Sequence, residues 1–213
     1  MPKSSAFSVN CRLCPRLSGF LDEVRVRYPG YYAGPVPSFG ESRPRLLVVG
    51  LAPGLHGANR TGRPFTGDHA GILLYATLHR HGFATGPESV AADDDLLLIG
   101  CRITNAVRCV PPANKPEPAE VRRCNAYLAE ELADLPRGAA ILALGSVAHG
   151  AVLKALGLRL REHPFAHGAV HPLSAGKALF DSYHCSRYNT QTRRLTAAMF
   201  DAVFAAAAAH LGG

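Results

Sequence analysis

The sequence predicts an α/β protein, a three-layer sandwich in which helices cover both faces of a central, mainly parallel four-stranded sheet. Short apolar runs alternate along the chain with segments of helical periodicity, and this alternation is typical of parallel sheets. Three of the apolar runs lead into polar stretches, as in open α/β sheets that bind ligands at the carboxyl ends of their strands. With 213 residues, the chain can bury one full hydrophobic core, so a single domain is expected.

The first predicted strand is 46–50, where consecutive apolar residues, two of them Val, fit a strand that is covered on both faces. The other predicted strands end near 103–105 or span 139–145 and 178–183. The helices predicted from apolar spacing are 21–28, about 71–81, 118–132, 146–156 and 192–211. The aromatic and proline-rich stretch 29–44 is expected to be an ordered surface loop.

The net charge of the chain is +7 and its pI is about 9.3, with many more Arg than Lys. This charge favours a polyanionic partner such as a nucleic acid. No stretch is long and apolar enough to span a bilayer, and residues 1–10 lack the apolar core of a signal peptide. We therefore expect a cytoplasmic protein with no membrane partner, and we expect it to be a monomer.

Four of the six cysteines have the spacing of a metal or cluster site. Cys11 and Cys14 form a C-x-x-C pair, and Cys109 and Cys124 flank a proline-rich stretch. In a cytosolic chain this argues against disulfides and for metal-bound or reactive thiols. Zinc and an iron–sulfur cluster both accept four thiolates, so the spacing does not choose between them. A redox dithiol and unrelated buried thiols are the alternatives.

The loop after the first strand, residues 50–68, reads G-L-A-P-G-L-H-G-A-N-R-T-G-R-P-F-T-G-D. Its glycines, arginines and closing acid place flexible backbone and charge at the end of a strand. A phosphate-cradling loop would need G-x-x-x-x-G-K-[ST], or G-x-G-x-x-G with a following acid. Neither is present, so a generic mononucleotide site is not favoured.

Polar residues also follow two other predicted strands: Asn105 at the second, and His184 and Ser186 at the last. Because the carboxyl ends of parallel strands meet at one edge of a sheet, we expect these residues to converge with loop 50–68 on one pocket. Each has a structural alternative, since Asn105 could cap a turn, His184 could be a core histidine and Phe65 could pack in the core. Their convergence is what favours a functional site.

Two other groups of metal-ligand residue types are interpreted as structural. Residues 93–95 are three consecutive Asp whose side chains point in different directions, so a solvated turn is favoured. His163, His167 and His171 are spaced by four and would share a helix face that could bind zinc. Two prolines and a glycine interrupt that segment, so these histidines are predicted to lie in a loop or hairpin.

Three motifs together resemble those of the uracil-DNA glycosylase superfamily. Loop 50–68 is similar to motif 1 of its type-B (family 5) branch. T-N-A-V-R-C-V-P-P at 104–112 is similar to the middle motif, and His184-x-Ser186-x-x-Asn189 is similar to the final motif. The resemblance extends from the C-x-x-C pair to residue 196, and the joint occurrence of these motifs in the right order is specific.

The sequence departs from the best-known branch of that superfamily at two places. Leu51 and Ala52 stand where that branch has a water-activating acid, and the type-B branch shares this substitution. Another residue must therefore take the role of the water-activating acid, and Asp68 is the candidate. In the final motif, Cys185 and Arg187 stand where a His-Pro-Ser-Pro form has prolines.

The resemblance implies a monofunctional DNA glycosylase of base excision repair. Such an enzyme flips uracil out of the DNA, hydrolyses the N-glycosidic bond and leaves an abasic site. Phe65 would stack on the flipped base, and Asn105 would read its Watson–Crick edge. His184 would donate to the carbonyl oxygen on which negative charge develops. Asp68 would orient water or stabilise the positive charge on the sugar.

The resemblance also implies residues that hold the substrate and the DNA. The substrate-binding set is Phe65, Gly54, Gly67, Ser186 and Asn189. The DNA-binding set is His56, Gly57, Arg187 and Tyr188, of which the last two would enter the gap left by the flipped base. Small residues at 52 and 54 would leave room for deaminated purines such as hypoxanthine and xanthine. Double-stranded and single-stranded DNA that contain deaminated bases are the expected partners.

For the four cysteines, the resemblance implies a [4Fe–4S] cluster held by Cys11, Cys14, Cys109 and Cys124. The cluster would have a structural role. It would join an N-terminal arm, residues 1 to about 44, to the loop between Cys109 and Cys124 near the DNA, within a single domain spanning residues 1–213.

Two other functions are alternatives. A non-catalytic iron–sulfur protein of the same fold that binds nucleic acid is supported by the missing acid after motif 1. Binding alone, however, would not require Asp68, Asn105 and His184 together. A metal-dependent nucleotide hydrolase would lose its activity in EDTA, whereas the glycosylase needs no free divalent ion.

Overall fold

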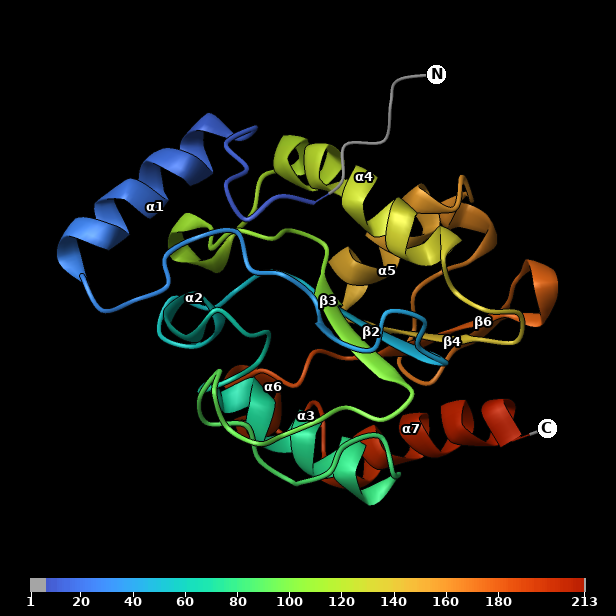
Figure 1. Ribbon diagram of the computed structural model, residues 1–213. Coiled ribbons are helices and arrows are strands. Elements are labelled where there is room, and N and C mark those ends of the chain that lie inside the picture. Colours follow the sequence, from blue (N-terminus) through green and yellow to red (C-terminus); the bar gives the residue numbers. More distant parts are fainter. Residues whose placement is uncertain (1–6, 213) are drawn as a thin grey trace.

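The computed structural model describes residues 7–212 and arranges them in three layers, with a central sheet between two layers of helices (Figure 1). In chain order the elements are α1 (Pro15–Arg27), β1 (Phe39–Gly40), β2 (Leu46–Gly50), α2 (Ala58–Thr61), α3 (His69–Arg80), β3 (Cys101–Asn105), α4 (Pro118–Ala133), β4 (Ala140–Leu144), α5 (Ser146–Ala155), β5 (Val170–Pro172), β6 (Ala178–Ser182), α6 (Arg187–Gln191) and α7 (Ala197–Gly212), with short 3₁₀ turns at Pro112–Asn114, Leu160–Glu162 and Ser174–Gly176.

The sheet has the strand order β1-β3-β2-β4-β6-β5. Its four central strands, β3, β2, β4 and β6, are parallel, and each connection between them carries at least one helix. Val48 at the middle of β2 pairs with Ile103 on one side and Leu142 on the other. These strands are the four that the sequence predicts, and the three-layer α/β architecture is confirmed.

The core lies on both faces of the sheet because successive residues of a strand point to opposite faces. In β2, Leu46 and Val48 pack in the core on the α3 and α7 side, whereas Leu47 and Val49 pack on the α4 and α5 side. All four side chains are fully buried. Burial on both faces explains why this strand reads as an uninterrupted apolar run rather than as alternating apolar and polar residues.

The predicted sheet of four strands is corrected to six. β1 pairs antiparallel with β3 at one edge, and β5 pairs antiparallel with β6 at the other. β1 has two residues and β5 has three, so neither is long enough to show the period-two pattern that identifies a strand in a sequence. The β5–β6 pair is the hairpin expected around His171.

Two predicted helices have different bounds in the structure. The first begins at Pro15 rather than near residue 21, with proline in the first turn, where its missing N–H leaves no helical bond unmade. The helix predicted over 192–211 lacks its first five residues. α6 ends at Gln191, Arg193 has a left-handed backbone, and α7 begins only at Ala197. Residues 192–196 read T-R-R-L-T, with neither Gly nor Pro to mark the break.

The loops after β2, β3 and β6 leave the sheet at the same edge, because these three strands are parallel. In Figure 1, helices α2 and α6 lie beside this edge, and they belong to the loops after β2 and β6. The fold therefore brings three segments that are far apart in the sequence to one place. Within residues 7–212, no helix combines the length and apolar character needed to cross a membrane.

Candidate active site

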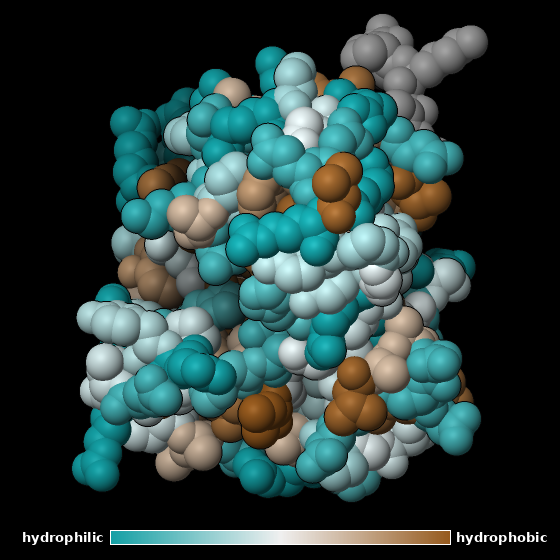
Figure 2. Space-filling view, turned by 90° about the vertical axis from the view of Figure 1, so that its left-hand side faces the viewer, coloured by the Kyte–Doolittle hydropathy of each residue, from teal (hydrophilic) through white to brown (hydrophobic). Residues whose placement is uncertain are grey.

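A cavity of about 620 Å³ lies at the carboxyl edge of the sheet, between the loops that follow β2 and β6. Figure 2 shows the side of the molecule where α1 lies, with hydrophilic side chains over most of the surface and a hollow between its upper and lower parts. The predicted site residues that line the cavity are Gly54, His56, Gly57, Gly67, Asp68, His184, Ser186 and Arg187. Loop 50–68, His184 and Ser186 therefore meet at one cavity as expected, whereas Asn105 is not among its described lining residues.

Asp68 is placed by the start of α3, where it is the N-cap residue with an extended backbone. Its carboxylate makes no capping hydrogen bond within the described chain, and it lies against two glycines instead. A Cβ atom at Gly54 would lie 2.5 Å from Asp68 Oδ2, and one at Gly57 would lie 2.6 Å from Asp68 Cβ. The Asp68 side chain fits at the cavity because both positions are glycine. It is the one acidic side chain among the described lining residues.

Phe65 and Asn105 meet over Gly50, at the end of β2. A Cβ atom at Gly50 would lie 2.4 Å from Asn105 Oδ1 and 2.7 Å from Phe65 Cζ. Asn105 is 3% exposed, and its Oδ1 atom has no hydrogen-bond partner among the described residues. A buried amide oxygen without a partner is unfavourable, so this atom is suited to accept a hydrogen bond from a ligand. Neither Phe65 nor Asn105 is among the described residues that line the cavity.

The backbone of Phe65 is left-handed, with φ at 58°. For a bulky residue this conformation costs on the order of 1–3 kcal/mol, and it persists where the surrounding structure enforces it. Gly71, in the first turn of α3, is part of that enforcement. A Cβ atom there would lie 1.9 Å from the carbonyl oxygen of Phe65. Only glycine lets the helix pack so close to this strained residue.

A loop between α3 and β3 holds the segment around Phe65 from outside. The buried guanidinium of Arg63 donates to the Asp94 carboxylate and to Ser89 Oγ. Ser89 also lies 2.8 Å from Thr66 Oγ1, and its carbonyl oxygen accepts from the Gly67 N–H at 3.1 Å. Although burial alone would raise it, the pKa of Asp94 is held below its usual range by hydrogen bonds from Arg63 and from backbone amides. Asp94 is thus part of a structured turn.

His184 is partly buried beside Phe65, with ring centroids 5.9 Å apart and ring planes 27° apart. Burial lowers the pKa of His184, and the negative charge of Asp68 opposes this shift. The imidazole is therefore neutral at neutral pH and carries one N–H to donate. Asn189 Nδ2 donates to the carbonyl oxygen of His184 at 2.8 Å. Asn189, expected among the substrate-binding residues, thus holds the backbone of His184 and is not among the described residues that line the cavity.

The short helix α6 carries the remaining predicted residues. Ser186 is its N-cap, and its hydroxyl oxygen accepts a hydrogen bond from the Asn189 N–H at 3.4 Å. Arg187 is exposed and lines the cavity, whereas Tyr188, which is 70% exposed, lies outside the described lining. The two side chains expected to enter the DNA are therefore both on the surface beside the cavity.

Two polar residues that line the cavity were missed by the sequence analysis. His69 follows Asp68 directly, and its Nε2 lies 3.1 Å from Thr190 Oγ1, so it links α3 to α6. Asn114 comes from the proline-rich loop between Cys109 and Cys124, where it has a left-handed backbone. The position next to Asp68 was a usable signal for His69. No motif marks Asn114.

Comparison with known proteins gives the chain its family. Residues 37–208 match the family model of the uracil DNA glycosylase superfamily. The chain belongs to this superfamily. A type-5 uracil-DNA glycosylase of Thermus thermophilus is 52% identical to it over 195 residues, which are 89% of this chain and 89% of the relative. One from Pyrobaculum aerophilum is 43% identical over 208 residues, 96% of this chain and 90% of the relative. The resemblance to the type-5 branch is confirmed.

A type-4 uracil-DNA glycosylase of Pyrobaculum aerophilum is also similar, with 37% identity over 131 residues, 61% of this chain and 58% of the relative. The type-5 relatives thus match more of the chain, at higher identity, than this type-4 relative.

In this glycosylase the four predicted cysteines lie together at one small cavity, which apolar side chains such as Leu17 also line. Burial, together with the neighbouring thiols, raises the pKa of Cys109 to about 12 and that of Cys124 to about 11. Four thiols that disfavour one another's ionisation become thiolates when a cation neutralises them. The donor set therefore fits a tetrathiolate metal site, the coordination that zinc and iron–sulfur clusters share.

Hydrogen-bond donors surround the same sulfur atoms. The backbone N–H of Arg108 donates to Cys124 Sγ at 3.3 Å, and the hydroxyl of Tyr127 donates to Cys11 Sγ at 3.4 Å. Such bonds stabilise negative charge on sulfur. The first bond joins the segment after β3 to α4, and the second joins α4 to the residues before α1, so the cysteine site ties the start of the described chain to α4.

Proposed function

We propose that this uracil-DNA glycosylase, a hydrolase of N-glycosyl bonds in DNA repair, uses Asp68, Asn105 and His184 to release uracil from DNA. The observation that carries the proposal is the placement of Asp68 and His184 on one cavity, with the Phe65 ring beside that of His184 and Asn105 next to Phe65 at Gly50. A base inside a duplex is out of reach of such a cavity. The enzyme therefore flips the nucleotide outward, at a cost of a few kcal/mol for unstacking.

Recognition of the flipped base falls to Phe65 and Asn105. The Phe65 ring stacks on the base, and the Asn105 amide pairs with its Watson–Crick edge. The Oδ1 atom of Asn105, which is buried without a partner among the described residues, accepts the N–H that uracil offers. The neutral imidazole of His184 donates to a carbonyl oxygen of the base, where negative charge develops as the bond breaks.

The sugar side of the reaction falls to Asp68. As the glycosidic bond breaks, positive charge develops on deoxyribose, and a carboxylate stabilises it or orients the attacking water. Uracil departs as a moderately stable anion, so one carboxylate is sufficient. This agrees with a cavity in which Asp68 is the one acid among the described lining residues.

The DNA backbone is held by groups around the cavity. We assign the phosphates on either side of the flipped nucleotide to Ser186, His56 and the backbone amides near Gly57 and Gly67. Arg187 and Tyr188 fill the gap that the base leaves, and the exposure of both side chains supports this role. The net charge of +7 favours the approach to DNA.

The substrate range extends to deaminated purines in this proposal. The small residues Ala52 and Gly54 both line the cavity and leave it wide enough for hypoxanthine or xanthine. The enzyme acts on double-stranded and single-stranded DNA, as a cytoplasmic monomer. We propose that residues 1–213 form one domain with an N-terminal arm of residues 1 to about 44; residues 1–6 and 213 lie outside the described residues.

We further propose that Cys11, Cys14, Cys109 and Cys124 hold a [4Fe–4S] cluster. The thiol cluster and its N–H and O–H donors support this assignment. When bound, the cluster supplies four iron–thiolate bonds that fasten the N-terminal arm. The four thiols line a different cavity from Asp68 and His184, which supports a structural role.

The glycosylase is tested by single-turnover incubation of duplex oligonucleotides that carry uracil or hypoxanthine, in the presence of EDTA. Base release should appear as alkali-labile sites in the lesion strand and should not require a free divalent ion. Binding of the uracil oligonucleotide without alkali-labile sites would instead support the non-catalytic binder. Release that stops in EDTA would support a metal-dependent hydrolase.

Replacing Gly54 by Ala should lower the rate of uracil release by about 10- to 100-fold, because the added methyl group displaces the Asp68 carboxylate. The unfolding temperature should change little. The matched control is Gly19→Ala, since a Cβ atom at Gly19, on exposed α1, meets no atom within 4 Å. Equal rates for the two variants would argue against a precisely held carboxylate.

Replacing Cys14 by Ser should lower the unfolding temperature and the iron content far more than it changes the ratio of uracil to hypoxanthine release. Cys14 is the N-cap of α1, so loss of its iron bond frees the N-terminal arm. Cys101→Ala is the control, because this thiol is buried in the core outside the set. It should keep the full iron content. A colourless Cys14→Ser protein with unchanged stability would contradict the assignment.

A further inference from the structure

His149, His171 and Asp181 form a cluster of metal-ligand side chains apart from the active-site cavity and from the four cysteines. They come from α5, β5 and β6. His149 Nδ1 lies 2.7 Å from Asp181 Oδ1, and His171 Nε2 lies 3.0 Å from Asp181 Oδ2. One ligand atom from each residue lies within 4.8 Å of the other two. Two imidazoles and a carboxylate therefore converge on one point.

Burial makes this cluster unlike a surface group of polar residues. The side chains of His149 and Asp181 are fully buried, and that of His171 is 11% exposed. A buried carboxylate is unfavourable unless it is paired or coordinates a metal. Among the described residues, the ion-pair partners of Asp181 are these two imidazoles, with no Arg or Lys. Because His171 is the only one of the three with a partly exposed side chain, an ion can reach the cluster from the surface beside His171.

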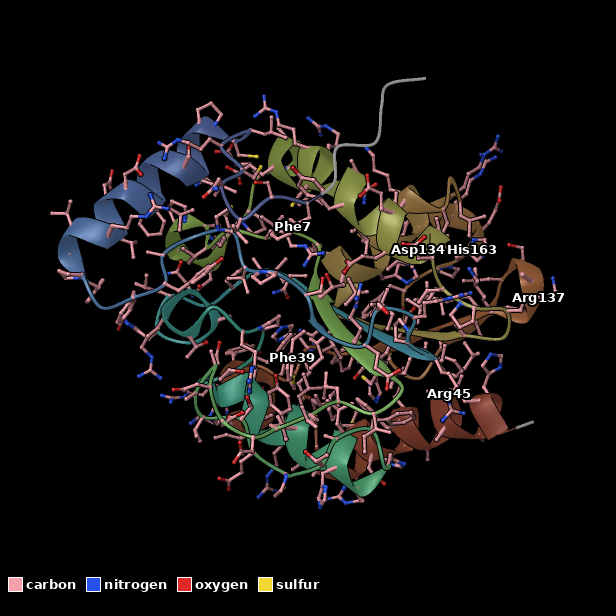
Figure 3. All side chains as sticks on the ribbon, in the orientation of Figure 1. Phe7, Phe39, Arg45, Asp134, Arg137 and His163 are labelled. Atoms are coloured by element: carbon pink, nitrogen blue, oxygen red, sulfur yellow. The ribbon has the colours of Figure 1, made fainter. Side chains whose placement is uncertain are left out.

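The second nitrogen of His149 has the partner that is typical of a metal ligand. Its Nε2 lies 2.8 Å from the carbonyl oxygen of His163 and donates to it. A ligating histidine almost always donates its other N–H to a carbonyl or carboxylate, which fixes the ring orientation and leaves the first nitrogen for the metal. In Figure 3, His163 lies on the side of the sheet where α4 and α5 lie, opposite to α3 and α7.

We propose that His149 Nδ1, His171 Nε2 and Asp181 bind a zinc ion. Two histidines and one carboxylate form a zinc ligand set with water in the fourth position. Bonds of about 2.0–2.1 Å in a tetrahedron place neighbouring ligand atoms about 3.3 Å apart. The imidazole nitrogens now lie 2.7 and 3.0 Å from the Asp181 oxygens, so a small outward shift of each ring gives this separation. The ion takes the place of the hydrogen bonds to Asp181.

Such an ion fastens β5, β6 and α5 to one another at the edge of the sheet. None of its three ligands lines the active-site cavity, so the expected effect is on stability rather than on base release. Spacing alone could not reveal the site. The series His163, His167 and His171 contributes the His171 ring, while His149 and Asp181 come from positions 22 residues before it and 10 after it.

The test compares wild type with His171→Gln, both carrying equal iron per chain, after dialysis against zinc chloride and then against zinc-free buffer. His171 is chosen because it is the least buried of the three. Wild type should retain one more zinc per chain than the variant. At zinc concentrations about a hundred times the dissociation constant, its unfolding temperature should rise by roughly 5 °C or more. X-ray absorption at the zinc edge should give only nitrogen and oxygen ligands.

The matched control is His79→Gln, which removes an exposed histidine of α3 and should bind zinc as wild type does. Equal zinc content and equal thermal shifts in wild type and His171→Gln would overturn the proposal and leave a hydrogen-bonded His-Asp-His cluster. Sulfur in the zinc shell would also overturn it, by locating the ion at the cysteines. Uracil release in EDTA should be the same for all three proteins, so this outcome is independent of the proposed function.

Discussion

Replacing Asp68 by Ala is expected to lower the single-turnover rate of uracil release by about a hundredfold or more, the size of a lost general base. The variant should fold normally, because the carboxylate makes no capping hydrogen bond within the described chain. Binding of the uracil oligonucleotide should persist, because the lost carboxylate stabilises the transition state much more than the bound substrate. The measurement is the rate of appearance of alkali-labile sites with enzyme in excess.

The control for this experiment is Asp93→Ala, which removes an exposed acid outside the described cavity lining and should release uracil at the wild-type rate. It corrects for the change in net charge, which both variants share. If Asp68→Ala released uracil within a few-fold of wild type, the proposed role of this carboxylate would be wrong.

Replacing His184 by Ala is expected to lower the rate of uracil release by about 10²–10³-fold, the usual cost of losing one donor to a developing oxyanion. The substitution also removes the ring stacked beside Phe65, so it could act through packing. His184→Gln separates the two effects, because its amide keeps a donor at similar reach. Partial recovery in His184→Gln relative to Ala supports the donor role. Equal losses in both variants, with a fallen unfolding temperature, would support packing.

The pKa of His184 gives a second readout. Burial lowers this pKa below the value in the unfolded chain, so the unfolded state binds the proton more readily. The resulting stabilisation is present above about pH 6.5 and is lost as pH falls through the folded-state pKa. Between pH 7 and pH 5, the unfolding temperature of wild type should therefore fall more than that of His184→Gln. Parallel curves for the two proteins would contradict a lowered pKa.

The parallel centre of the sheet could be predicted because its strands are buried on both faces. Residues 46–50 form such a strand, and the apolar run carries the information locally. The edge strands β1 and β5 could not be predicted, because two or three residues become a strand only when a neighbour supplies the hydrogen bonds. The break between α6 and α7 was hidden for a similar reason. It depends on the left-handed backbone at Arg193, which no glycine marks.

The site was predictable where chemistry and topology agree. Asp68 and His184 follow parallel strands, so their meeting at one edge could be foreseen. The position of Asn189 behind His184 could not be foreseen. Asn189 lies within one helical turn of the lining residue Ser186, yet its side chain holds the backbone of His184 instead of lining the cavity. Asn114 was also out of reach, because the path of the loop between Cys109 and Cys124 depends on contacts made after folding.

The loop between α3 and β3, which holds the segment around Phe65, offers a way to alter the base preference of the enzyme. Ser89 and Asp94 touch neither the base nor the sugar in the proposed reaction, yet they anchor residues 63–67. The loop therefore supports the ring that we propose to stack on the base. On that proposal, substitutions in the loop are expected to tilt the Phe65 ring and to change which bases are accepted, with Asp68 and His184 left unchanged. Libraries that seek glycosylases with new lesion preferences can therefore begin at residues 85–99 rather than in the cavity.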